Sequence, residues 1–211
     1  MATGRKQGVV SIFEWFQNPS LSVVPDISIS ADGAVKSVRL FSKVPIEQIE
    51  SVALDTSSLT SSALTKIVLS ETYDVTPTYV DSPPNLNDML SKCDAGLIIG
   101  DLGLFHSPVR KVLDLGSEWK NLTGMPFCYA AWLAQPGADL GKLHSILTAA
   151  RAWGLQNVDS ICTEWSVKMN LDIERVIDYL CTVMQYDLGP DKLSAVECFR
   201  DYCGKYGLMD R

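Results

Sequence analysis

The chain has 211 residues, is 46% hydrophobic and carries a formal net charge of −7, from 18 basic and 25 acidic residues. That length and apolar fraction are enough to bury a core, in one domain or in two small lobes. The acidic balance argues against non-specific binding to nucleic acid or to an anionic membrane surface.

No apolar run approaches the length of a membrane span, and the polar start, residues 1–7, does not resemble a signal peptide. With only His106 and His144, and no C-x-x-C pair, the chain lacks the ligand spacing of a zinc site. Most of the cysteines lie in apolar or helical surroundings, which suits reduced core thiols of a cytoplasmic protein. They are Cys93, Cys128, Cys162, Cys181, Cys198 and Cys203.

Predicted strands and helices alternate up to Pro136, and only helices are predicted after it. Strands are expected at 8–13, 23–30, 35–42, 52–54, 76–80, 95–99, 111–115 and 127–133, with a turn at 31–33. Helices are expected at 14–18, 58–71, 85–92, 117–122, 140–153, 160–169, 173–184 and 192–206. This order indicates an α/β fold with a mostly parallel sheet and a helical C-terminal part.

The stretch from Asp55 to Ser62 holds six hydroxyl side chains in eight residues, at the junction of a buried strand and an amphipathic helix. A helix start offers unpaired N–H groups and the positive end of a dipole, so hydroxyl donors there can bind a carboxylate or a phosphate. Ser and Thr are also the residues that cap helices in any protein. The pattern alone leaves both interpretations open.

Asp101 follows a strand and Gly100, in an expected loop at 100–103 where open α/β sheets bind ligands. It is either a functional carboxylate or a helix cap. His106 is expected in a surface loop and His144 on an exposed helix face. Glu14 is a base beside a ligand, a helix cap or the partner of a basic side chain.

Several stretches resemble the chorismate dehydratases of the futalosine route to menaquinone. They are VVSIFEW, SISADGAVKSVRLFSK, VALDTSSLTSSAL, LIIGD and DLGSEWKNLTGMPFCYAAW. The blocks D-T-S-S-x-T-S and D-L-G-x-E-W-x-x-L-T-G-x-P-F carry most of the resemblance, which follows nearly the whole chain in order.

The resemblance implies a two-lobed α/β fold of the periplasmic-binding-protein type (type 2) with the substrate in the cleft. One lobe is expected at 1–43 plus 108–211 and the other at 44–107, with the chain crossing near 40–46 and 106–111.

The implied activity is loss of water from chorismate to give 3-[(1-carboxyvinyl)oxy]benzoate, without a metal or an organic cofactor. Ser11 and the backbone of Ile12 are expected to hold one carboxylate, and Gly100 with Asp101 to line the cleft floor. Ser11 and Asp101 are the expected catalytic residues. The other end of the substrate is expected to bind Ser57, Ser58, Thr60 and Ser61.

A related family, 1,4-dihydroxy-6-naphthoate synthase, has a catalytic histidine at the position of Gly100.

Members of the family begin with a further strand-helix segment. A mis-assigned start, a fragment and a shortened protein each explain its absence here, and we expect poor solubility or a homodimer for this chain alone. Two other functions stay open from the residues: a cytoplasmic module that binds a small carboxylate without chemistry, and a remnant without a ligand.

Overall fold

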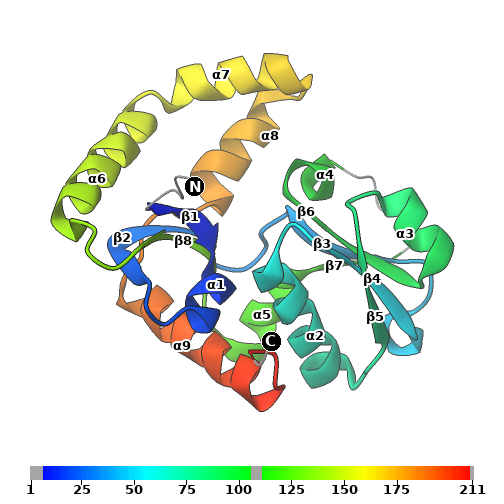
Figure 1. The fold of residues 1–211 in the computed structure, drawn as a ribbon. Coiled ribbons are helices and arrows are strands. Elements are labelled where there is room, and N and C mark those ends of the chain that lie inside the picture. Colours follow the sequence, from blue (N-terminus) through cyan, green and yellow to red (C-terminus); the bar gives the residue numbers. More distant parts are fainter. Residues whose placement is uncertain (1–6, 106–110, 210–211) are drawn as a thin grey trace, which may run out of the picture.

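Two β-sheets lie side by side in the structure, a computed structural model that describes residues 7–105 and 111–209 (Figure 1). The first sheet has three strands in the order β1 (Gln7–Ser11), β8 (Phe127–Ala134) and β2 (Ser22–Ala31). The second has five, in the order β5 (Thr78–Ser82), β4 (Ser51–Asp55), β6 (Ala95–Ile99), β3 (Val38–Ser42) and β7 (Lys111–Asp114).

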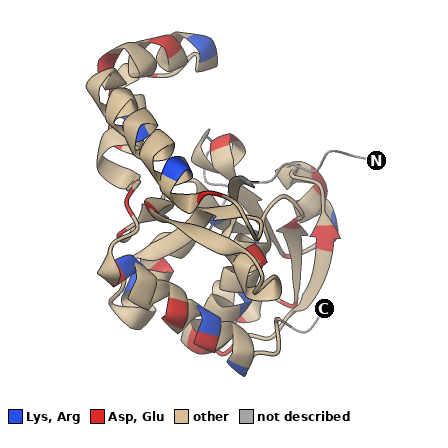
Figure 2. Cartoon of the chain, turned by 60° about the vertical axis from the view of Figure 1, so that its left-hand side comes forward, with Lys and Arg blue, Asp and Glu red and all other residues tan. Residues whose placement is uncertain are grey.

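Helices fill the connections and extend beyond the sheets. The body contains α1 (Ile12–Gln17), the short 3-10 helix η1 (Ile46–Gln48), α2 (Leu59–Tyr73), α3 (Leu86–Lys92), α4 (Gly100–Phe105), α5 (Leu115–Thr123) and α9 (Pro190–Lys205). Three helices form an arm that projects from the first sheet (Figures 1 and 2). They are α6 (Leu140–Gln156), α7 (Val158–Met169) and α8 (Ile173–Ile177), the last continuing into a π-helical segment, η2 (Asp178–Val183).

The α/β class is confirmed, but the expectation of a mostly parallel sheet is wrong. Of the six strand pairings between described strands, only β4 with β5 and β4 with β6 are parallel. Alternation of strands and helices predicts parallel crossovers only between strands that are consecutive in one sheet. Here β8 returns between β1 and β2, and β3 lies between β6 and β7, so distant segments pair antiparallel.

Three local predictions also change. The expected loop at 100–103 is the first turn of α4, and the expected strand at 35–42 begins only at Val38. The strands on either side of the turn at 31–33 belong to different sheets, so the chain passes at this turn from the three-stranded to the five-stranded sheet. β3 and β7, outside the expected lobe 44–107, pair with strands of the five-stranded sheet.

The segment that crosses from β2 in one sheet to β3 in the other is hydrogen-bonded to a single carboxylate. Asp114 accepts hydrogen bonds from the backbone N–H groups of Val35 (3.0 Å) and Lys36 (2.7 Å) and also caps α5. Lys36 has a φ of 63°, in the left-handed region that a lysine rarely adopts. A Cβ atom on Gly116 would lie 2.3 Å from the carbonyl oxygen of Gly33. The crossing therefore fits tightly against α5 and requires glycine there.

One hydrophobic cluster joins the two sheets. It runs from β8 through α5 and α9 to the buried face of α2 and to β4 and β6. Trp119 is fully buried at its centre and makes edge contacts with Phe127, Phe199 and Tyr202. Its Nε1 donates to the carbonyl oxygen of Pro126 at 3.0 Å. Because the cluster is continuous, the two sheets are packed together through α2, α5 and α9.

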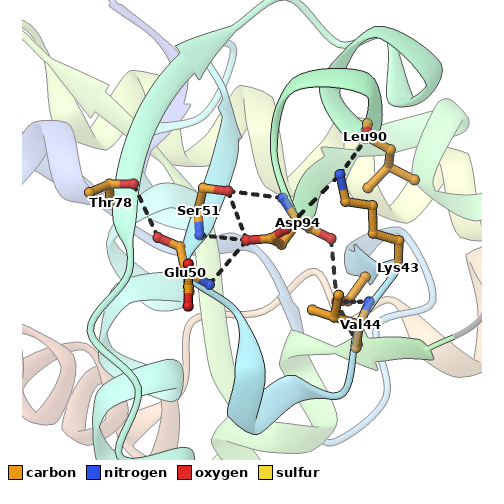
Figure 3. A network of polar contacts seen from close by, with 8 residues as sticks. Lys43, Val44, Glu50, Ser51, Thr78, Leu90 and Asp94 are labelled. Carbon is orange, nitrogen blue, oxygen red and sulfur yellow. Dashed lines mark hydrogen bonds and ion pairs between the residues drawn. The ribbon is translucent and has the colours of Figure 1, made fainter.

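Asp94, directly before β6, fixes the starts of two neighbouring strands (Figure 3). Its carboxylate accepts from the backbone N–H groups of Glu50 (3.2 Å) and Ser51 (3.1 Å) and from the Ser51 hydroxyl (2.9 Å). Lys43 donates to the carbonyl oxygen of Leu90 and lies 4.0 Å from the Asp94 carboxylate. Burial acts to raise the pKa of Asp94, but the hydrogen bonds outweigh it and the pKa is lowered.

Asp94→Asn is expected to lower the free energy of unfolding by about 1–3 kcal/mol at neutral pH, because acceptor oxygens of the network are lost. A lowered folded-state pKa means that the wild-type carboxylate stabilises the fold above pH 3.8, the ordinary aspartate value, and that this stability is lost as the pH falls through the folded-state pKa. Urea unfolding of both proteins between pH 7 and pH 3 checks this. A difference in unfolding free energy between the wild type and Asp94→Asn that grows as the pH falls would contradict this prediction.

Charges of both signs are interspersed on α9, as Figure 2 shows. No helix within residues 7–105 and 111–209 is both long enough and apolar enough to cross a membrane.

Candidate functional site

The predicted hydroxyl residues meet where α1 and α2 begin. Ser11, the last residue of β1, hydrogen-bonds through Oγ to Oγ1 of Thr60 and accepts from the Thr60 backbone N–H at 3.1 Å. Thr60 Oγ1 also accepts from the backbone N–H of Phe13 at 3.1 Å. Residues 49 positions apart thus join the first turns of two helices, α1 after a strand of the first sheet and α2 after a strand of the second.

The rest of the hydroxyl stretch forms a cap. Ser58 accepts the Ser61 backbone N–H at 3.2 Å and donates to the Ser61 hydroxyl at 2.9 Å, so the cap interpretation is confirmed for Ser58. Ser57 donates to Oδ1 of Asp55 through its backbone N–H (2.9 Å) and its hydroxyl (2.6 Å). Oδ2 of Asp55 is buried and has no hydrogen-bond partner in the structure of the described residues. The anion-site interpretation stays a prediction.

The side chain of Ile12, the first residue of α1, is fully buried in the core, so only its backbone remains as a candidate for binding a ligand. Ser57 is exposed, Ser58 is half-buried, and Thr60 and Ser61 are buried. A ligand that bound here would therefore meet Ser57 and Ser58 first. It would reach Ser11 and Thr60 only by replacing part of the hydrogen bonding between them.

Gly100 and Asp101 lie at the start of α4, at the end of β6. Gly100 has a φ of 63°, which glycine adopts without strain and which lets the chain turn directly from the strand into α4. Asp101 is exposed and lines a cavity of about 520 Å³ between α4, β3 and the arm helices α7 and α8. Small-molecule sites have volumes of about 300–1,000 Å³.

The cavity wall carries three basic and two acidic side chains among apolar ones. Lys36 forms an ion pair with Asp178, so these two charges offset one another. The hydroxyl of Tyr179 donates to Oγ of Ser37 at 2.9 Å. Burial raises the pKa of Tyr179, the Ser37 hydrogen bond opposes this, and the negative charge of Asp101 adds to it. Tyr179 therefore stays a neutral hydrogen-bond donor at neutral pH.

Arg39 and Tyr179 were not identified from the sequence. Arg39 is the half-buried position of an otherwise buried apolar strand, Val38–Ser42, and a charged residue within such a strand was a usable signal. Tyr179 lies in a helix that periodicity describes correctly, but periodicity does not show that the helix contains a π-helical segment.

Other candidates have structural roles or lie outside the described residues. His106 is outside them. His144 pairs with Asp26 at 3.0 Å, and Glu14 accepts a hydrogen bond from Asn18 at 2.9 Å. Cys93, Cys128, Cys162 and Cys203 are buried, as expected of core thiols. Among the residues that the structure describes, no three His, Cys, Asp or Glu side chains are grouped so that they could hold a metal ion.

Solved structures with the same arrangement define the class of fold. A protein of Archaeoglobus fulgidus superposes with a TM-score of 0.72 at 16% identity, over 97% of this chain and 80% of that one. The periplasmic aliphatic sulphonate binding protein SsuA of Escherichia coli gives 0.60 at 16% identity, over 99% and 77%. The chain therefore has a periplasmic-binding-protein-like fold.

Sequence comparison then gives the family. The model of a family described as menaquinone biosynthesis matches residues 6–205. Chorismate dehydratase of Thermus thermophilus is 34% identical over 204 residues, which are 88% of this chain and 74% of that protein. Chorismate dehydratase of Campylobacter jejuni is 27% identical over 185 residues, 87% and 69%. The chain belongs to the menaquinone biosynthesis family.

Proposed function

We propose that this chain is a chorismate dehydratase, a hydro-lyase that converts chorismate to 3-[(1-carboxyvinyl)oxy]benzoate in the cytoplasm, on the futalosine route to menaquinone. The observation that carries the proposal is the 34% identity to the Thermus thermophilus enzyme over 88% of the chain. The Ser11–Thr60 contact supports it, because it joins the first turns of α1 and α2, which follow strands of the two different sheets.

Substrate binding would use the cleft between two lobes built on the two sheets. Ser11 and the Ile12 backbone would hold one carboxylate of chorismate, and Ser57 with Ser58 the other end. Thr60 and Ser61, which are buried, would keep those hydroxyl and N–H groups in place. Gly100 would let the substrate approach the backbone closely. Neutral donors suit a dianion in a chain of charge −7, because they add local attraction without more basic residues.

The reaction breaks one ring C–H bond and the C–O bond of the ring hydroxyl, and the electron pair of the C–H bond becomes the new ring double bond. Water leaves, and aromatisation supplies the driving force. A carboxylate of the substrate would accept the ring proton. The protein would orient the dianion and exclude water, and neither a metal nor an organic cofactor would take part. Asp101 would interact with the departing hydroxyl.

A second candidate function is capture of a small carboxylate without chemistry. The fold neighbour SsuA, which is a binding protein by its title, is the observation behind it. Calorimetry with chorismate, followed by chromatography of the same sample, separates the two functions. Heat of binding with chorismate unchanged supports capture, whereas conversion to an aromatic product supports the lyase.

Asp101→Asn is expected to lower kcat for chorismate about 100-fold, the usual scale for misplacing a reacting group, because Asp101 is proposed to orient the departing hydroxyl. Asp101 is exposed, so the variant should melt like the wild type. Asp88→Asn, at an exposed position in the first turn of α3, is the matched control and should keep full activity. Equal kcat values in the wild type and Asp101→Asn would remove Asp101 from the catalytic assignment.

A further inference from the structure

The arm contains two cysteines that the proposed reaction does not use. Cys162 lies in α7 and Cys181 in η2, which continues α8. The chain reverses direction between α7 and α8, and the two helices pack against one another (Figure 1). Cys162 is seven residues before Met169, the end of α7, and Cys181 is eight residues after Ile173, the start of α8. At about 1.5 Å per residue, the two cysteines lie at similar distances from the turn between the helices.

The burial pattern places Cys162 on the face of α7 that meets α8. Cys162 and Ser166 are the buried residues of α7, and Val176 is the buried residue of α8. Helical residues four positions apart lie on one face, so Cys162 and Ser166 mark one side of α7. Because α7 packs mainly on α8, this side is the one turned toward it.

The two thiols are in contact across this packing. The side chains of Cys162 and Cys181 are within hydrogen-bonding reach of one another, and both are free thiols in the structure. The hydroxyl of Tyr186, which donates to the carbonyl oxygen of Leu180 at 2.9 Å, lies near both of them. Close approach of the two sulfur atoms is the first requirement for a disulfide.

The two thiols differ in exposure. Of the six cysteines, Cys181 is exposed, Cys198 is half-buried and the other four are buried. Burial raises the pKa of Cys162, and the charge and the hydrogen bond of Cys181 add to this. The thiolate is the reactive form of cysteine, and access to solvent decides which thiol meets an oxidant. Cys181 therefore reacts first, and Cys162 is the thiol beside it.

We propose that Cys162 and Cys181 form an intramolecular disulfide when the chain meets a peroxide. The Cys181 thiolate attacks one oxygen of hydrogen peroxide, the O–O bond breaks, hydroxide leaves, and Cys181 becomes a sulfenic acid. The sulfur of Cys162 then loses its proton and attacks the sulfur of Cys181, whose S–O bond breaks so that the hydroxyl group leaves as water. In sum, two thiols lose two protons and two electrons, and one peroxide is reduced to two water molecules.

The disulfide ties together two walls of the cavity that Asp101 lines. Ile161 and Trp165 belong to α7, Tyr179 and Leu180 belong to η2, and all four line this cavity. Each wall thus includes an immediate neighbour of a linked cysteine, so the bond limits how far the walls can separate. The inference does not depend on the proposed reaction, because thiols and linked peptides are measured without turnover.

The test is treatment of the folded full chain with hydrogen peroxide, followed by thiol counting in denaturant and by peptide mapping. The reduced chain has six thiols, and the oxidised chain should have four. Trypsin cleaves after Lys168 and Arg175, so the peptides that contain Cys162 and Cys181 separate unless a disulfide joins them. The mass of the joined peptides should appear after peroxide and disappear after dithiothreitol.

Three variants assign the bond. Cys162→Ser and Cys181→Ser should each abolish the joined peptides, and because Cys181 is exposed, its variant should fold even if loss of the buried Cys162 thiol disturbs the arm. Cys198→Ser, at the half-buried cysteine of α9, is the matched control and should form the bond like the wild type. Oxidised wild type should also have a higher Tm than reduced wild type, a difference that Cys181→Ser should lose.

Two results overturn the proposal. In the first, the peptides that contain Cys162 and Cys181 stay separate in peroxide-treated wild type, whatever happens to the individual thiols. In the second, either cysteine is joined instead to another cysteine of the chain or to a second copy of it.

Discussion

Thr60→Val is expected to lower kcat/KM for chorismate about 100-fold or more, the usual scale for misplacing the groups that position a substrate. The hydroxyl of Thr60 bonds to Ser11 and accepts the backbone N–H of Phe13, so it fixes the groups proposed to hold a substrate carboxylate. Valine keeps the shape of threonine but leaves both partners without this contact. Steady-state kinetics with chorismate measures the effect.

Thr65→Val is the matched control, because Thr65 lies in the same helix, is also buried, and donates from Oγ1 to the carbonyl oxygen of Ser61 at 2.8 Å. Each variant should lower the free energy of unfolding by about 1–3 kcal/mol, since each loses buried hydrogen bonding. Only Thr60→Val should lose activity. A folded Thr60→Val with the kcat/KM of the control would remove the Ser11–Thr60 contact from the site.

Trp119→Ala is expected to lower the free energy of unfolding by about 3–5 kcal/mol, the largest stability effect that we predict for a single substitution. Trp119 is fully buried at the centre of the cluster that joins the two sheets. Its loss leaves a cavity against Phe127 and Phe199 and leaves the carbonyl oxygen of Pro126 without the indole donor. Urea unfolding followed by circular dichroism measures the loss.

Two further variants test why Trp119→Ala lowers the free energy of unfolding. Trp119→Phe should cost less than Trp119→Ala, because it keeps most of the ring contacts and loses the indole hydrogen bond. Trp153→Ala, at a position that is 62% exposed on α6, should change the unfolding free energy by less than about 0.5 kcal/mol. Equal losses of unfolding free energy in Trp119→Ala and Trp153→Ala would show that the cluster does not hold the two sheets together.

Local pattern predicted the elements well where apolar spacing was regular. The helix expected at 58–71 is α2, and the strand expected at 95–99 is β6 with the same bounds. Strand direction was not predictable in the same way. Pairings such as β1 with β8 join segments more than 100 positions apart, and nothing in either segment specifies which distant strand will be its neighbour.

The candidate site was predicted unevenly for a similar reason. A run of Ser and Thr at a strand-helix junction is visible in the sequence, and the structure places Ser11 against it. Hydroxyl groups that bond to one another and hydroxyl groups that await a ligand have the same pattern, so the sequence alone did not separate cap from anion site. Arg39 became a candidate only when β3, α4 and the arm were seen to enclose a cavity.

The most direct test of the central claim is incubation of the purified chain with chorismate, with product separated by chromatography and identified by mass. We predict an aromatic product lighter than chorismate by one water and matching 3-[(1-carboxyvinyl)oxy]benzoate, formed equally fast in the presence of EDTA. Well-folded protein that binds chorismate and returns it unchanged would contradict dehydratase activity and favour the binding module.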